Sequence, residues 1–241
     1  MSIYPKIKDF GEQALLLEWN NEISLTIHKE IMRYKHTIDS RFQSIVIETV
    51  PTYASLAIYL NKSANKEAFI SELNSGLLLS EIIQKSQRII HIPVCYEIEY
   101  GWDLPEMAHK LNIPIDEIIS RHIDQEYPVY FLGFLPGFPY LGGLDPKIAF
   151  QRKATPRKQV DKGSVGIAGS QTGIYTMDSP GGWNIIGRSP LNFFDVSQEN
   201  PCLLVPGDLV KFYKISRKLY EEIYFQVKNQ NYSLRKEVRD V

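Results

Sequence analysis

Hydrophobic and polar positions in the first part of the chain switch repeatedly between strand-like and helix-like spacing. In chain order, the segments are a strand at Ala14–Trp19, a helix at Ile23–Tyr34, strands at Ser44–Thr49 and Ala54–Leu60, a helix at Lys66–Leu73 that Leu77–Lys85 would continue, and a strand at Arg88–Val94. This is the split βαβ order, which predicts a ferredoxin-like α+β domain at the N-terminus. Other sheet arrangements are compatible with the same alternation.

A change in pattern divides the chain. The polar stretch Gln84–Gln87 and Pro93 mark a boundary, which predicts one domain over residues 1–86 and another over 87–241. From Tyr127 onward, short β-prone runs are separated by glycine and proline, and many short strands at close spacing favour a barrel or a sandwich. Helices of the second domain are expected at Asp103–Lys110, Ile115–His122 and Ser216–Val227.

Most of the chain's 15 glycines lie in one window, Gly133–Gly187. Glycine at that density indicates backbone that turns with positive φ or lies close to another group. Aromatic side chains and arginines are interleaved with these glycines, which is typical of a binding surface carried on loops. The alternative is a tightly turned β-barrel whose glycines serve its geometry alone.

The charge balance argues against polyanionic partners. The net charge is −1, and the basic residues are scattered apart from a short cluster over Arg152–Lys162, so neither nucleic acid nor an anionic membrane is expected as a partner. The two cysteines, Cys95 and Cys202, have no metal-ligand spacing, and reduced thiols are favoured over a single disulfide. The N-terminal residues lack the apolar segment of a signal peptide, and no apolar run reaches membrane-spanning length, so a cytoplasmic location is expected.

Several common catalytic motifs are missing from the sequence. The segment Gly163–Gly169 is glycine-rich but matches neither the Walker spacing nor GxGxxG, and it lacks a lysine to contact phosphate. The five histidines form no ligand pair on one helix face, so no metal site is expected, and GxSxG is absent. A chain with so few acid, base or nucleophilic groups in its informative window is either a binding surface or half of a shared active site.

Four residues of the glycine-rich window are candidate ligand contacts. Arg157, on a proline-stiffened loop, and Arg188, at the end of the segment WNIIGR, could each bind a carboxylate or phosphate through two hydrogen bonds. Gln171 is a neutral residue of the type that orients an amide, and Trp183 follows a Ser-Pro-Gly-Gly turn. Surface ion pairing for the arginines, solvation for Gln171 and core packing for Trp183 are the alternatives.

A rigid aromatic segment, Gly133–Gly143, supplies the expected wall of this site. Its prolines fix φ, and Phe134, Phe138 and Tyr140 offer flat apolar faces to a ligand or a protein partner, or else cover the end of a barrel. His122 precedes the first β-prone run and is the titratable group nearest in sequence, with a structural role as the alternative. These eight residues are the predicted substrate-binding set.

Four motifs of the window together are highly specific: GF-x-PGF-x-Y-L, PR-x-x-V-x-x-GSV-x-IAG-x-QTGIY, SPGGW and IIGR. They resemble the B-subunit family of 5-oxoprolinase, also called allophanate hydrolase subunit 1 or KipI-type sporulation-kinase inhibitors. The similarity is collinear from the His91 strand through Asp208. It implies an N-terminal α+β domain followed by a mostly β, cyclophilin-like barrel.

The resemblance also implies a function in a complex. The family works with the C subunit of 5-oxoprolinase and with its LamB/YcsF-type A subunit to open 5-oxo-L-proline to L-glutamate with hydrolysis of ATP. ATP is therefore expected as a cofactor of the complex, although this chain has no nucleotide motif, and the isolated chain is expected to be inactive. The resemblance leaves two alternatives: inhibition of a sensor histidine kinase, and a role in a urea or allophanate-processing enzyme of the biotin-dependent carboxyltransferase type.

The departures from the family pattern are small. Val160–Gly163 lacks the usual proline and small residue before glycine, and Thr176-Met177 replaces a more usual continuation. Neither change touches the arginine, glutamine or PGGW positions, so they affect the expected loop conformation and not the family resemblance.

Overall fold

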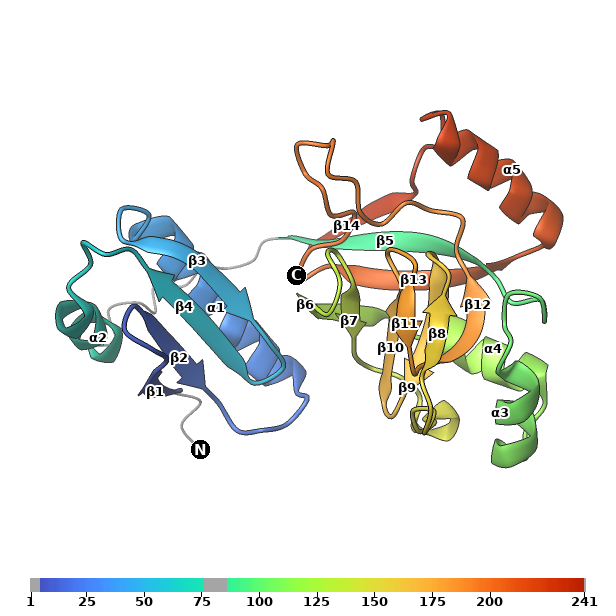
Figure 1. The fold of residues 1–241 in the computed structure, drawn as a ribbon, viewed down its shortest axis with the longest axis horizontal. Coiled ribbons are helices and arrows are strands. Elements are labelled where there is room, and N and C mark those ends of the chain that lie inside the picture. Colours follow the sequence, from blue (N-terminus) through green and yellow to red (C-terminus); the bar gives the residue numbers. More distant parts are fainter. Residues whose placement is uncertain (1–4, 76–85, 241) are drawn as a thin grey trace. The chain divides into compact units, whose positions relative to one another are not determined.

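A computed structural model describes residues 5–75 and 86–240 of the chain (Figure 1). It divides into two compact units, Met1–Lys85 and Ser86–Val241, each with its own hydrophobic core. The helical continuation expected over Leu77–Lys85 lies outside the described residues. The two units are considered separately below.

The first unit is a four-stranded antiparallel sheet with two helices. The strand order is β1-β2-β4-β3, with bounds Lys6–Asp9 for β1, Ala14–Glu18 for β2, Val46–Pro51 for β3 and Ser55–Leu60 for β4. Helix α1 spans Leu25–Arg41 and α2 spans Lys66–Asn74. Alternate apolar residues of the central strands, among them Leu15, Leu17 and Ile58, pack against Ile31 and Ile38 of α1. The apolar face of the sheet and the apolar face of the helix therefore form one core.

The ferredoxin-like order predicted for this unit is not confirmed. Its expected last strand, Arg88–Val94, belongs to β5 (Ser86–Cys95), which lies in the second unit. Strand β5 pairs there with β13 along seven residues and with β14 on its other side, so its backbone groups are already satisfied. The sheet edge beside β2 is instead occupied by β1, which forms a hairpin with it.

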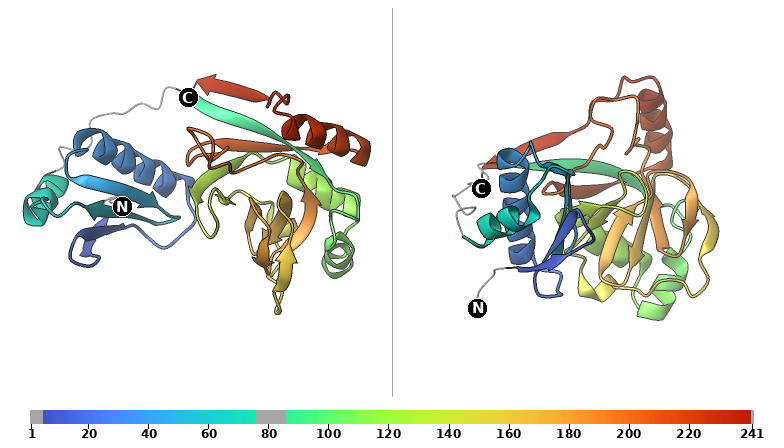
Figure 2. Two further views of the ribbon diagram at one scale, coloured as in Figure 1. Left: turned by 45° about the horizontal axis from the view of Figure 1, so that its top comes forward. Right: turned by 60° about the vertical axis from the view of Figure 1, so that its left-hand side comes forward.

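The second unit is a closed β-barrel, which is one of the two architectures that the short β-prone runs favoured and the one that the family resemblance implied (Figures 1 and 2). Its eight-stranded sheet has the order β12-β9-β10-β7-β6-β13-β5-β14, and β12 also pairs with β5, so seven strands close the ring and β14 lies outside it. The bounds are Tyr127–Leu132 for β6, Pro139–Leu141 for β7, Ser164–Ala168 for β9, Gln171–Ile174 for β10, Asn184–Arg188 for β12, Leu209–Ile215 for β13 and Lys236–Asp240 for β14.

Short helices and one extra ribbon surround the barrel. Strands β8 (Arg157–Val160) and β11 (Ser179–Gly181) form a separate two-stranded ribbon. The helices are α3 at Leu104–Leu111, α4 at Ile115–Ile123, α5 at Arg217–Lys228 and a 3-10 turn, η1, at Pro146–Ile148. The helices expected over Asp103–Lys110, Ile115–His122 and Ser216–Val227 are therefore confirmed within one residue at their ends.

The barrel closes where two strands approach too closely for a side chain. A Cβ atom on Gly187 of β12 would lie 2.7 Å from Cγ1 of Val94 and 2.8 Å from the carbonyl oxygen of Cys95 on β5. The next residue, Arg188, pairs with Cys95 and completes the ring. Glycine is thus required at this position to join the two ends of the sheet.

His122 lies in the interior of the barrel and not at its surface. Its Nδ1 is 2.8 Å from the hydroxyl of Tyr96, its Nε2 is 3.0 Å from Oγ1 of Thr172, and its ring stacks on Phe212 at 4.6 Å. The side chain is fully buried, and this burial lowers the pKa of His122 to about 3. His122 therefore connects α4 to Tyr96, the residue after β5, and to strand β10 as a neutral imidazole.

This burial predicts a loss of stability in mild acid. The unfolded chain protonates His122 near its ordinary pKa of about 6.5, whereas the folded protein resists protonation until the pH approaches 3. The contribution of the neutral imidazole is thus complete above the unfolded pKa and declines as the pH falls. From pH 7 to pH 5 the parent should lose about 2 kcal/mol of unfolding free energy more than His122→Gln, which cannot titrate.

Urea unfolding of both proteins at the two pH values measures this difference. His28, buried in the first unit with its pKa lowered to about 4, titrates in both proteins, so its contribution cancels in the comparison. Identical pH dependence in parent and variant would contradict the prediction.

Candidate functional site

A cluster of aromatic rings forms around Phe138, which belongs to the segment expected to be the wall of the site. Phe138 is buried, and its ring packs edge-on against Tyr175 at 5.4 Å, Trp183 at 5.4 Å and Tyr140 at 5.1 Å. Gly173 of β10 lets these rings approach the sheet, since a Cβ there would lie 2.9 Å from Phe138 and 3.0 Å from Trp183. The cluster is thus rigid, and it leaves Tyr140 half-buried at its edge.

A small pocket opens beside this cluster. It has a volume of about 260 Å³ and brings together three residues of the predicted set, Tyr140, Gln171 and Trp183. The rest of its lining comes from the loop before β8 and the β9–β10 turn, namely Gln151, Arg152, Ala168, Gly169 and Ser170. An aromatic wall, neutral amides and a guanidinium around a small volume suit a compact polar ligand with an apolar face.

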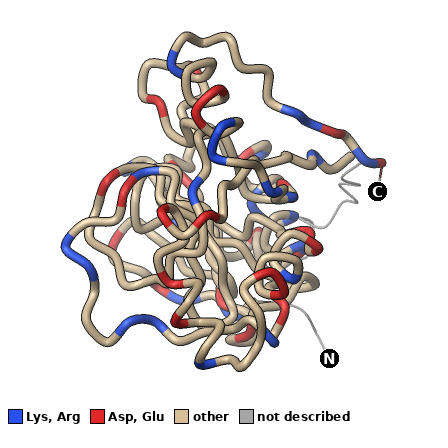
Figure 3. Tube along the Cα trace, turned by 90° about the vertical axis from the view of Figure 1, so that its right-hand side faces the viewer, with Lys and Arg blue, Asp and Glu red and all other residues tan. Residues whose placement is uncertain are grey.

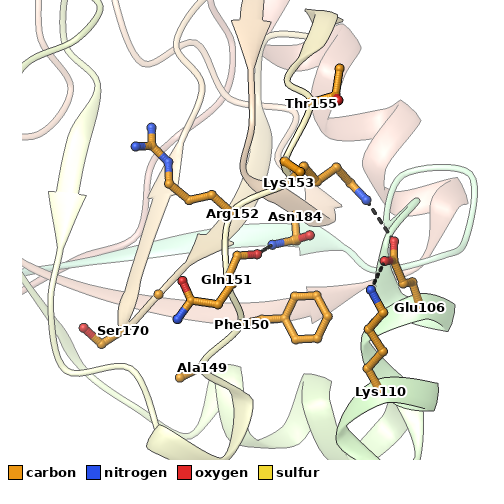
Figure 4. A pocket seen from close by; sticks show the side chains of 12 residues that line it. Glu106, Lys110, Ala149, Phe150, Gln151, Arg152, Lys153, Thr155, Ser170 and Asn184 are labelled. Atoms are coloured by element: carbon orange, nitrogen blue, oxygen red, sulfur yellow. Dashed lines mark hydrogen bonds and ion pairs between the residues drawn. The ribbon is translucent and has the colours of Figure 1, made fainter.

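A larger pocket adjoins the first and shares four of its residues. It has a volume of about 920 Å³, and Gln151, Arg152, Gly169 and Ser170 line both. Its other side is formed by Phe150 and the loop after it and by Glu106 and Lys110 of α3 (Figure 4). Lys110 and Lys153 both hydrogen-bond Glu106 and lower the pKa of its carboxyl to about 2, so this acid is ionised and paired.

The loop between the two pockets is fixed by backbone and amide hydrogen bonds. The buried Asn184 donates from Nδ2 to the carbonyl oxygens of Gln151, at 2.8 Å, and Ile167, at 3.2 Å. The Lys153 amide donates to the carbonyl of Gly182, at 2.8 Å, and Phe150 exchanges two backbone hydrogen bonds with Gly169. The loop is therefore attached to β9, to the β9–β10 turn and to the turn before β12.

Arg157 is held by a buried carboxylate beside the larger pocket. Its Nη2 lies 2.6 Å from Oδ1 of Asp103, a residue only 2% exposed, and its guanidinium lies 5.4 Å from the centre of the Trp102 ring. Asp103 also binds Nζ of Lys153 at 2.8 Å and accepts the Ile185 amide at 2.7 Å. Arg157 thus has a structural partner, although Nη1 is buried with no hydrogen bond among the described residues.

Arg188 lies away from the small pocket. On β12 it is opposite Ser164, whereas Asn184, next to Trp183, is opposite Ile167 near the other end of β9. Its guanidinium is 3.0 Å from Oδ2 of Asp161 and donates from Nε to the Lys162 carbonyl at 2.9 Å. The structure therefore does not bring Arg188 to the pocket that Gln171 lines.

Phe134 differs from the other aromatic residues of the segment. Its side chain is 62% exposed, and its backbone has a φ of +64°, which is costly for a residue with a Cβ atom. The ring contacts Phe138 edge-on at 5.5 Å, so it lies on the outside of the aromatic cluster. It does not line either pocket, and neither does the buried His122.

Sequence reasoning missed the residues that organise the loop between the pockets. The pattern alone places Asp103 in a helix cap and Arg152 at the start of a basic cluster. Basic and acidic residues are interspersed along the barrel trace, so charge singles out neither (Figure 3). A usable signal lies in the run Gln-Arg-Lys-Ala at residues 151–154. In an extended loop, the neighbouring cations Arg152 and Lys153 point to opposite sides, so they would not share one partner.

The described residues hold few groups that could carry out a reaction alone. They contain no cluster of three or more His, Cys, Asp or Glu side chains able to bind a metal ion. Burial raises the pKa of the phenol of Tyr140, and the charge of Arg152 only partly opposes this effect, so the phenol is a neutral hydrogen-bonding group. The pockets are therefore suited to binding and orienting a ligand.

Comparison with known proteins identifies relatives along almost the whole chain. The family model of the carboxyltransferase domain, subdomain C and D, matches residues 5–204. The chain is 36% identical to the B subunit of 5-oxoprolinase from Bacillus subtilis over 232 residues, which cover 91% of this chain and 97% of that protein. Relatives with the same name occur in Escherichia coli and Haemophilus influenzae.

Two further similarities concern a solved structure and a much longer protein. A conserved uncharacterized protein of Pyrococcus horikoshii is 41% identical, with a TM-score of 0.54, and the match covers 89% of this chain and all of that one. Urea amidolyase of Lachancea kluyveri is 35% identical over 251 residues, 90% of this chain but only 14% of that protein. No helix among the described residues is long and apolar enough to cross a membrane.

The buried carboxylate of Asp103 should contribute strongly to stability. We expect Asp103→Asn, which keeps the shape but removes the charge, to lower the unfolding free energy by about 2 kcal/mol, because two cations lose their ionic partner. Asp161→Asn is the matched control: it removes the more exposed pair with Arg188 and should cost less than about 1 kcal/mol. Urea unfolding of both variants tests the ranking, and equal losses would contradict it.

Proposed function

This chain belongs to the family of the carboxyltransferase domain, subdomain C and D, and we propose that it is the B subunit of an ATP-dependent 5-oxoprolinase that converts 5-oxo-L-proline to L-glutamate. The observation that carries the proposal is the match with proteins of that name over most of the chain: 36% identity over 91% of this chain and 97% of the Bacillus subtilis relative. The candidate site is compatible with it, because the described residues offer a binding pocket and hold no cluster able to bind a metal ion, as in a protein that shares its active site.

The chemistry of the reaction explains why this chain would act with partners. A five-membered lactam is stable, and ATP can supply activation by phosphorylating the amide oxygen. No nucleotide motif is present in the sequence, so we assign the nucleotide to the assembled complex. We propose that the C and A subunits of 5-oxoprolinase complete the site and that the isolated chain has no activity.

The small pocket is the proposed place of the lactam. The Trp183 and Tyr140 rings offer an apolar surface to the ring carbons, and the Gln171 side chain can both donate to and accept from a cyclic amide. Of the eight residues predicted from the sequence, these three line the pocket, and Phe138 supports them from behind. Arg157, Arg188, Phe134 and His122 do not line this pocket.

Urea processing is supported less well by the comparisons. The urea amidolyase relative is a far longer protein, in which this chain corresponds to 14% of the length. The 5-oxoprolinase relatives, by contrast, are matched over nearly their whole length, and the B subunit is therefore the better interpretation. Inhibition of a histidine kinase has no support from a specific structural observation.

Reconstitution tests the proposed function. We expect the chain mixed with its A-type and C-type partner subunits to release glutamate from 5-oxo-L-proline only when ATP is present, because activation and binding groups are then combined. The matched control is the same mixture without this chain, which should be inactive. Glutamate formation at the same rate in that control would show that the assignment is wrong.

A further inference from the structure

The basic side chains around the two pockets differ in whether they have a partner. Lys153 binds Asp103 and Glu106, Lys110 binds Glu106, and Arg157 binds Asp103. Arg152 forms no ion pair or hydrogen bond with any side chain in the described parts of the molecule, although it lines both pockets. Among the described residues, Glu106 is the one acid that lines either of these two pockets, and it is already paired with Lys110 and Lys153, so the positive charge of Arg152 remains available to a ligand.

The backbone on each side of Arg152 is fixed, so the free cation has a defined location. The carbonyl before it accepts from Asn184, and the amide after it donates to Gly182. Figure 4 shows the consequence: Lys153 points toward Glu106, whereas Arg152 leaves the loop on the opposite side. An extended segment places consecutive side chains on opposite faces, so the paired Lys153 determines the direction of the unpaired Arg152.

The surroundings of Arg152 are those of a site for a small anion with an apolar ring and an amide. In the small pocket the guanidinium is joined by Tyr140, Trp183 and the Gln171 amide. Its charge acts on the hydroxyls of both Tyr140 and Tyr175, whose pKa values are raised by burial and partly lowered again by this arginine. Arginine is also the side chain whose planar fork matches a carboxylate through two hydrogen bonds.

We propose that Arg152 binds the carboxylate of the substrate, and that it makes the pocket selective for a lactam that carries a carboxylate over a neutral lactam. This inference rests on the proposed function for the reaction, but it assigns a cation that neither the resemblance nor the predicted set included. Arg152 is thus a specificity-determining residue. Arg157 and Arg188, which the sequence favoured, keep the structural partners Asp103 and Asp161.

A single carboxylate fits this position better than a polyphosphate. A triphosphate requires several free cations or a glycine-rich helix N-terminus, and the other two cations of the larger pocket, Lys110 and Lys153, are paired with Glu106. One unpaired guanidinium beside neutral hydrogen-bonding groups compensates one negative charge. The charge balance of the pocket therefore favours a monoanion.

Steady-state kinetics of the reconstituted complex test the proposal. Arg152→Ala should raise KM for 5-oxo-L-proline by about ten- to a hundredfold, as expected for a lost charged hydrogen bond, with a smaller change in kcat. Arg152→Lys keeps the positive charge but loses the planar guanidinium, so its KM should lie between that of the parent and that of Arg152→Ala. Lys158→Ala is the matched control, because Lys158 is an exposed cation of β8 that lines neither pocket.

A neutral competitor separates the carboxylate from the rest of the pocket. Inhibition by 2-pyrrolidinone, the same lactam ring without the carboxylate, should be unchanged in Arg152→Ala. The proposal is overturned if KM for this variant stays within about twofold of Lys158→Ala. It is equally overturned if the inhibition constant for 2-pyrrolidinone rises as much as KM, because Arg152 would then act on the shape of the pocket.

The failure of the proposed function would be distinguishable from the failure of this inference. If the parent complex releases no glutamate, the function is wrong, and binding is then measured by ligand-observed NMR on the same mixture. Binding of 5-oxo-L-proline to the parent but not to Arg152→Ala would still support the anion site. Equal binding to both proteins, or none to the parent, would refute it.

Discussion

The geometry of the candidate site depends on one buried carboxylate, that of Asp103. A carboxylate removed from water is tolerated only when its oxygens are occupied by strong donors, and here it receives an amide of β12 and two cations from the loop and ribbon opposite. Asp103 also stands at the start of α3. One side chain therefore joins a helix, a barrel strand and the segment that carries Arg152, and it occupies the cations that would otherwise compete for the same ligand.

This arrangement divides the basic residues of one short segment into two groups. Lys153 and Arg157, which neutralise Asp103 and Glu106, hold the segment in place, whereas Arg152 lines the pockets without such a partner among the described residues and is available for binding. The aromatic cluster behind the small pocket adds a rigid surface. Gly173 and the turn before Trp183 let the ring of Phe138 contact the rings of Tyr140, Tyr175 and Trp183. Binding groups and their support thus come from segments far apart in the sequence.

Local periodicity was sufficient for the three helices of the second unit and for the short strands of a barrel or a sandwich, and the family resemblance favoured the barrel. Of the predicted site residues, three from the glycine-rich window line the small pocket. The sequence pattern was insufficient where the structure depends on contacts between residues far apart in the chain. Strand β5 has the same apolar pattern whether it pairs in the first unit or in the barrel, and only its contacts with β13 and β14 distinguish the two. Likewise the sequence favoured Arg157 over Arg152 as an anion contact, and only the fold shows that Asp103 already pairs with Arg157.

The strand outside the ring has a mechanical consequence. Asp240 at the end of β14 is paired with Ser86 at the start of β5, so the chain enters and leaves the barrel at adjacent points of an antiparallel ladder. Tension applied between these two points would act across the strands and break their hydrogen bonds one at a time, as in unzipping, instead of shearing them together. All five residues of β14 are exposed, so this strand could peel away while the seven-stranded ring and its pockets stay intact.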